Sequence, residues 1–139
     1  MKIITKEINI STEGNCDIKN ITDKVIDILH NSKLKEGSCT VFSIGSTASV
    51  TTIEYEPGLL KDIPKILEKM IPSFSRYHHN ETWGDGNGHS HIRSAIFGTS
   101  LTIPFTKSEL ILGKWQQIVL IDFDNRKRNR RIAIQLTGE

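Results

Sequence analysis

The last third of the chain reads as a succession of short strands with no helical segment between them. Turn-forming residues before Leu110 and at Asp124-Asn125 separate the strands and favour antiparallel hairpins. A parallel doubly wound sheet needs strands and helices to alternate, so this run excludes that fold. We predict an α+β fold with a mostly antiparallel sheet. The five expected strands cover residues 91–97, 99–105, 109–112, 115–123 and 130–137.

The first half of the chain supplies two main helices and three further strands. The strands are expected at residues 2–10, 38–44 and 50–54. One helix starts at Asp17 as its N-cap and buries Ile18, Ile21, Val25, Ile28 and Leu29. The other starts at Asp62, has Pro64 in its first turn, and buries Ile63, Ile66, Leu67 and Met70. Residues 73–90 are polar and without period, which predicts a long loop of the kind that often carries function.

The composition is that of a globular protein with one domain over residues 1–139. Hydrophobic residues make up 37% of the 139 residues, which is enough to fold on. No apolar run reaches the roughly 18 residues that a bilayer span needs, and the first ten residues alternate like a strand rather than a secretory signal. Cys16 and Cys39 show no CxxC spacing and fit ordinary thiols in a reducing compartment. We expect a cytoplasmic protein that does not bind membranes.

Positive charge is concentrated at residues 126–131. Five of the 18 Lys and Arg residues lie there without an acid, whereas the rest of the chain carries 13 basic against 16 acidic side chains. Arg128 and Arg130 share one face of an extended chain, and arginine forks suit phosphate. A solvated edge strand explains the run equally well. The acidic remainder argues against a nucleic-acid partner and favours a small anion such as a phosphate.

The densest cluster of reactive side chains lies between residues 78 and 91, where four of the five histidines fall. If the segment around His89 and His91 is a strand, both imidazoles project from one face. A third imidazole from the preceding loop then completes a three-nitrogen metal site with an open position. Exposed loop histidines, or hydrogen-bond donors to an anion, are the alternative interpretation.

A second group of polar residues follows the strand at 38–44. Hydroxyl and backbone N–H groups at Gly45-Ser46-Thr47 can bind phosphate oxygens. The carboxylates of Glu54 and Glu56 can hold Mg²⁺ beside a diphosphate, or they are solvated side chains at a strand end. Thr51 and Asp62 belong to the same group. A nucleophile elbow, a phosphate-binding loop and a dinucleotide-binding turn are all absent from the sequence.

Three separated motifs resemble the YjbQ-like family, whose members are often called secondary thiamine-phosphate synthases. They are the stretch from Trp83 to His91, the stretch from Leu112 to Gln117, and the ending from Arg128 to Glu139. The resemblance implies an α+β subunit in a homotrimer with sites near subunit boundaries. It also implies a reaction that joins hydroxymethylpyrimidine diphosphate to a thiazole phosphate and releases diphosphate, as a main or a side activity.

The resemblance also assigns site residues. It implies catalytic or metal-binding roles for three histidines, His79, His89 and His91. Glu54 or Asp85 is then the general base or the group that orients a histidine. The metal expected at such a site is a divalent ion, Zn²⁺ or Mg²⁺. Phosphate and substrate contacts fall to Ser46, Thr47, Asn87, Trp115, Gln116, Arg128 and Arg130. Many bacterial members have His where this chain has Gly45. If that histidine takes part in catalysis, its absence lowers or removes the synthase activity of this chain. A non-catalytic module that binds a phosphorylated ligand is the alternative function.

Overall fold

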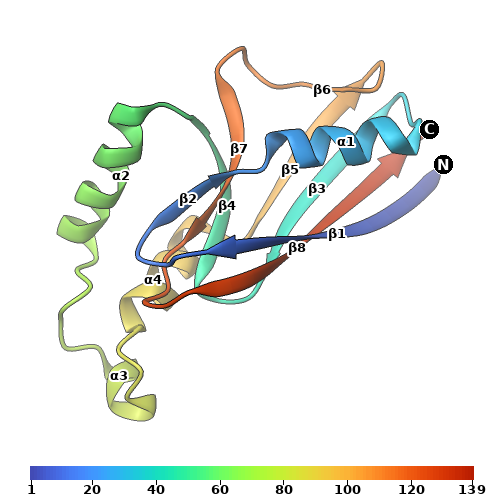
Figure 1. The fold of residues 1–139 in the computed structure, drawn as a ribbon. Coiled ribbons are helices and arrows are strands. Elements are labelled where there is room, and N and C mark those ends of the chain that lie inside the picture. The colour runs from blue at the N-terminus through green and yellow to red at the C-terminus, as the bar shows by residue number, and fades with distance from the viewer.

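Two antiparallel sheets and four helices make up the computed structural model, which describes residues 1–139 (Figure 1). The predicted α+β class with a mostly antiparallel sheet is confirmed, with four helices rather than two. The strands are β1 (Lys2–Thr12), β2 (Asp17–Asn20), β3 (Gly37–Ile44), β4 (Ala48–Glu54), β5 (Ser100–Thr106), β6 (Glu109–Leu110), β7 (Gln116–Asp122) and β8 (Arg128–Gly138). The helices are α1 (Thr22–Ser32), α2 (Pro57–Met70), α3 (His78–Trp83) and α4 (Gly88–Phe97).

The larger sheet has the order β1-β8-β3-β5-β6, and the smaller one has the order β2-β7-β4. Every pair of neighbouring strands is antiparallel. The long β1–β8 ladder joins the two ends of the chain, with Lys2 opposite Gly138 and Thr12 opposite Arg128. That register places the start of β8 beside the turn that leads into β2.

Strand β7 lies between two hydrophobic clusters. Ile118 and Leu120 belong to the main core of 16 buried residues, which α1 covers with Val25 and Leu29. Val119 and Ile121 face the opposite way, into a second cluster of six buried residues that includes Leu67 of α2. Since side chains alternate between the two faces of a strand, the continuous apolar run of β7 contributes residues to both clusters.

Both predicted helix starts are wrong. Asp17 pairs in β2 opposite Asp122, and α1 begins at Thr22, whose backbone N–H donates to the Asn20 side chain. Helix α2 begins at Pro57, where the fixed φ of proline suits the first turn. The Glu56 carboxylate accepts the backbone N–H groups of Gly58 and Leu59, so Glu56 is the N-cap.

The predicted strand at 91–97 is helix α4, and the predicted loop at 73–90 contains helix α3. Helix α4 buries a polar face and exposes an apolar one. The buried side chains on it are His89, Ser90, Arg93 and Ser94, while Ile92, Ile96 and Phe97 are exposed. The usual amphipathic signal is therefore inverted, which is why the periodicity of the sequence does not reveal the helix.

In Figure 1, α4 lies near the end of β4 where that strand begins, and α3 lies beyond α4. Helix α2 lies to one side of the smaller sheet and packs against it through Leu67. None of the four helices is both long and apolar enough to span a bilayer.

Candidate functional site

Neighbouring elements anchor the polar face of α4. Ser90 Oγ donates to the Phe123 carbonyl at 2.5 Å, and Ser94 Oγ donates to the Ala48 carbonyl at 2.6 Å. Arg93 donates to the Ile71 carbonyl through Nε and Nη2. Because β4, the segment after β7 and the end of α2 contribute acceptors, the orientation of the helix is set by hydrogen bonds rather than by apolar packing.

His79 and His91 come together at this helix. Their ring centroids are 4.4 Å apart with an interplanar angle of 43°. His79 Nδ1 is buried and has no hydrogen-bond partner. Burial, followed by the repulsion of His79, lowers the pKa of His91, while Asp124, Asp85 and a hydrogen bond to the Ser46 backbone act in the opposite direction. The lowered pKa favours the neutral imidazole of His91.

His89 does not join this pair. Residues two apart on a helix point about 200° away from each other, so the expected common strand face does not exist. The His89 side chain is buried, its Nδ1 has no partner, and burial together with the nearby Arg93 charge lowers its pKa. The structure holds no group of three or more His, Cys, Asp or Glu side chains arranged to bind a metal ion. The three imidazoles do not converge, and a metal stays a prediction.

A buried ion network lies next to the histidine pair. Arg130 donates from Nε and Nη2 to both oxygens of Asp122, at 2.6 and 2.7 Å, and from Nη2 to Thr47 Oγ1 at 2.7 Å. Arg128 donates to Asp124 at 2.8 Å. Both carboxylates are fully buried. Sequence reasoning missed Asp122 and Asp124, although two aspartates that end an apolar strand just before the arginine run were a usable signal.

Asp124 also connects the remaining predicted polar residues. It accepts hydrogen bonds from Asn87 Nδ2 at 3.2 Å and from Thr47 Oγ1 at 3.1 Å. Its burial raises its pKa, but the hydrogen bonds from Asn125, Arg128 and Asn87 outweigh that effect and lower it. Asp85 is exposed, and its carbonyl accepts the Asn125 side chain at 2.7 Å. Asn87 and Thr47 thus position the network, and Asp85 lies on the solvent side.

Most of the basic run is paired with carboxylates. Besides Arg128 and Arg130, Lys127 lies 3.5 Å from Glu13 and Arg131 lies 2.7 Å from Glu7. Arg126 is the member of the run without a salt bridge. The expected face shared by Arg128 and Arg130 is present, but its charge is largely balanced within the chain.

A polar pocket of about 410 Å³ lies beside the network. Gly45 and Ser46 form one side of it, and α4 contributes His91 and Ser94. Ser46 is exposed and Thr47 is buried. The pocket brings Gly45 and Ser46 of the predicted phosphate segment together with His91, whereas Thr47 does not line it.

Glu54, Trp115 and Gln116 lie at the other end of β4 and β7. Glu54 pairs with Gln116 there, whereas Ala48 at the histidine end pairs with Asp122. Six residues of extended strand separate the ends by about 20 Å. Glu54 and Trp115 line a separate pocket of about 300 Å³. Within one chain, the predicted carboxylate and aromatic contacts therefore do not meet the histidines. Glu56 lines the same pocket as Glu54 and Trp115, whereas Thr51 and Asp62 line neither pocket.

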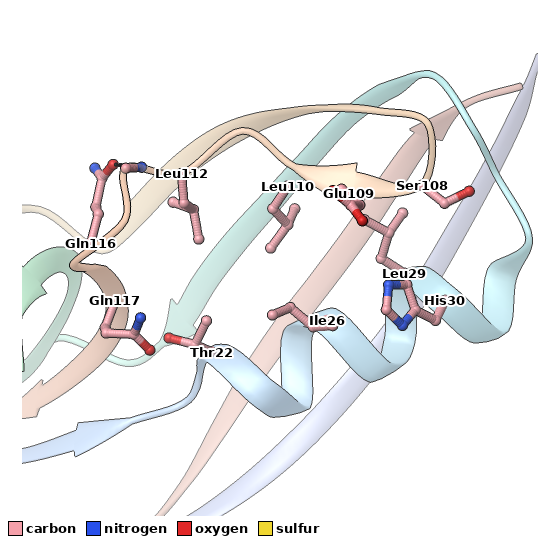
Figure 2. A pocket seen from close by; sticks show the side chains of 11 residues that line it. Thr22, Ile26, Leu29, His30, Ser108, Glu109, Leu110, Leu112, Gln116 and Gln117 are labelled. Carbon is pink, nitrogen blue, oxygen red and sulfur yellow. Dashed lines mark hydrogen bonds between the residues drawn. The ribbon is translucent and has the colours of Figure 1, made fainter.

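A third pocket, of about 300 Å³, lies between α1 and the segment that joins β6 to β7. In Figure 2, Leu110 and Leu112 face Ile26 and Thr22 of α1 across it. Sequence analysis did not identify this pocket, and only Gln116 of the predicted site residues lines it.

Comparison with known proteins places the chain in a family. A family model described as UPF0047 protein YjbQ-like matches residues 6–139. A UPF0047 protein of Methanothermobacter thermautotrophicus is 34% identical over 139 residues, covering 100% of this chain and 95% of that protein. One of Synechocystis is 31% identical over 131 residues, covering 94% and 88%.

Two solved structures are similar over nearly their whole length. A YbjQ-like protein of unknown function from Sulfolobus solfataricus has a TM-score of 0.94 and 30% identity, covering 99% of each chain. A hypothetical protein from Aeropyrum pernix has a TM-score of 0.92 and 29% identity, covering 98% of this chain and 99% of that one. The family match and these likenesses agree, and the chain belongs to the YjbQ-like UPF0047 family.

Proposed function

We propose that this protein binds a phosphorylated small molecule in the pocket beside Gly45 and Ser46, and that it acts as a thiamine-phosphate synthase of secondary type. The observation that carries the proposal is the position of the His91 imidazole, which contacts His79 and lines a polar pocket near the Arg130 guanidinium. The lowered pKa of His91 supports it, because it favours the neutral ring. The named activity comes from the family resemblance, and the geometry supports a site for phosphoryl oxygens.

In this reaction, the negative charge that develops on the leaving diphosphate is the main feature that the protein has to stabilise. The bond between the pyrimidine methylene carbon and the diphosphate oxygen breaks, and its electron pair leaves on the diphosphate. The thiazole ring nitrogen then forms the new carbon–nitrogen bond and becomes positively charged, so no proton is removed from it. Neutral imidazole N–H groups and guanidinium N–H groups can donate to the departing oxygens. A divalent cation that accompanies the diphosphate enters as part of the substrate, and no step here depends on it.

A non-catalytic binding module is the second candidate. Gly45 favours it, because the family resemblance implies a histidine at this position in many bacterial members, and this chain lacks the hydrogen-bond donor that such a histidine would offer to the leaving group. The charge balance of Arg128 and Arg130 with Asp124 and Asp122 also fits a rigid receptor for an anion. The pairing of the basic run supports the expectation that nucleic acid is not a partner.

We also propose a homotrimer. Exposed apolar side chains on α2 and α4, including Ile66, Met70 and Ile96, are the kind of surface that a second copy covers. Glu54 and Trp115 reach a ligand at the histidine end only if a neighbouring copy supplies them. A mass of three chains by light scattering is expected, and a monomer at micromolar concentration would contradict the trimer.

The test measures diphosphate release from hydroxymethylpyrimidine diphosphate in the presence of the thiazole phosphate. We expect His91→Ala to lower the rate about 100-fold or more, the range for loss of a proton-transfer or hydrogen-bond donor group. His78→Ala is the matched control, since His78 lies next to His79 with its side chain fully exposed. Tight substrate binding without turnover in the wild type supports the binding module. Equal rates for both variants contradict any role of the histidine pair.

A further inference from the structure

Gly45 occupies a backbone conformation that other residues rarely adopt. Its φ is +151°, in the bend between β3 and β4. A Cβ atom placed on Gly45 would meet one neighbour within 4 Å, Arg130 Nη1, at 3.3 Å. The absence of a side chain at position 45 therefore leaves the space next to this nitrogen open, at the edge of the pocket that Gly45 helps to line.

Arg130 uses two of its three guanidinium nitrogens inside the chain. Nε and Nη2 donate to Asp122, and Nη2 also donates to Thr47. Nη1 donates to no group of the protein. The side chain is only 8% exposed, and Nη1, which has no hydrogen-bond partner, is not fully buried. A buried guanidinium is thus held rigidly with one N–H donor group uncovered.

We propose that Arg130 Nη1 donates to one oxygen of the bound phosphoryl group, and that Gly45 is a specificity-determining residue because it keeps this donor accessible. The inference rests on the proposed function. It assigns the anionic end of the substrate to the Gly45–Ser46 side of the pocket and leaves the His91 side to the group that reacts.

The neighbouring charges define what this donor can bind. Asp122 balances the charge of Arg130, so Nη1 offers a directed hydrogen bond rather than surplus positive charge. The Arg130 guanidinium cannot bind a phosphoryl group through two nitrogens, since Nε and Nη2 already donate to Asp122 and Thr47. We therefore expect a compact phosphoryl group that contacts one guanidinium nitrogen and completes its contacts on the backbone of the bend.

Nitrogen-15 NMR of the arginine guanidinium groups tests the contact directly in the wild-type protein. Because Nε and Nη2 are fixed, the Arg130 signals are expected to be narrow and distinct, and inorganic diphosphate should shift the Nη1 signal at saturation. The His91 ring signals, recorded in the same titration, report occupancy of the pocket. If diphosphate shifts His91 but leaves Nη1 unchanged, this inference is overturned while the proposed function stands.

Gly45→Ala is the second test. Its methyl group crowds Nη1, and we expect diphosphate affinity to fall about tenfold or more, as for a lost hydrogen bond to a charged group. Gly84→Ala is the control for backbone strain, because Gly84 has φ +71° and an added Cβ there meets nothing within 4 Å. Thermal unfolding of both variants checks that they are folded. Unchanged diphosphate affinity in folded Gly45→Ala overturns the inference, and synthase turnover is measured separately.

Discussion

At the scale of single residues, burial decides what each ion pair contributes. Arg130–Asp122 and Arg131–Glu7 have nearly equal closest distances, 2.6 and 2.7 Å. The first pair has side chains that are 8% and 0% exposed, whereas those of the second are 58% and 41% exposed. Water competes for the exposed pair, but a buried carboxylate that loses its partner has nothing to replace it.

We expect Arg130→Met to lower the free energy of unfolding by about 3–5 kcal/mol, since it removes the cationic partner of the buried Asp122. Arg131→Met, in the neighbouring residue, should be hard to distinguish from the wild type. Urea denaturation at pH 7 measures both variants. Equal losses in the two would show that burial does not govern the stability of these pairs.

At the scale of secondary-structure elements, α4 is held in place by hydrogen bonds from its buried polar side chains. Its inward side chains satisfy carbonyl groups of β4, of the segment after β7 and of the end of α2. Arg93 in particular donates to the Ile71 carbonyl at 2.6 and 3.1 Å and to Glu68 at 3.2 Å. Since α2 ends at Met70, this arginine closes the C-terminus of that helix and ties it to the histidine site.

Arg93→Met should loosen α2 because the Ile71 carbonyl loses a charged donor, at a cost of about 2–3 kcal/mol. Hydrogen exchange of the peptides covering residues 57–70 is expected to quicken, with β8 much less affected. Arg76→Met serves as the control, because the Arg76 side chain is 96% exposed. Unaltered exchange in α2 would contradict this role of Arg93.

At the scale of the whole molecule, β7 couples the two clusters. Its residues alternate between the main core and the smaller cluster under α2, so neither cluster can open without disturbing the other. The two tryptophans report on different parts of the fold, Trp83 at the end of α3 and Trp115 just before β7.

We expect Trp83→Phe and Trp115→Phe, each with one tryptophan left, to give the same urea midpoint when followed by fluorescence at one protein concentration. Shared burial of β7 makes unfolding cooperative, and coincident transitions are its signature. A midpoint for the Trp83 probe well below that of the Trp115 probe would mean that the α3–α4 region unfolds separately.

The sequence by itself determined the strand-rich, antiparallel character of the fold and the position of most strands. β1, β3 and β8 have alternating or apolar sequences. Because successive side chains of a strand point to opposite faces, such sequences predict strands without knowledge of the rest of the fold. It also indicated the pocket segment Gly45-Ser46-Thr47 and the face shared by Arg128 and Arg130.

Only the tertiary structure decided the histidine site. Helix α4 hides polar side chains because carbonyl acceptors from Ala48, Ile71 and Phe123 meet them, and these partners lie far away in the sequence. The same holds for part of the charge of the basic run, because Glu7 and Glu13, which pair with Arg131 and Lys127, lie at the other end of the chain. A local pattern shows which residues are polar, but whether a polar group can be buried depends on a partner that folding brings to it.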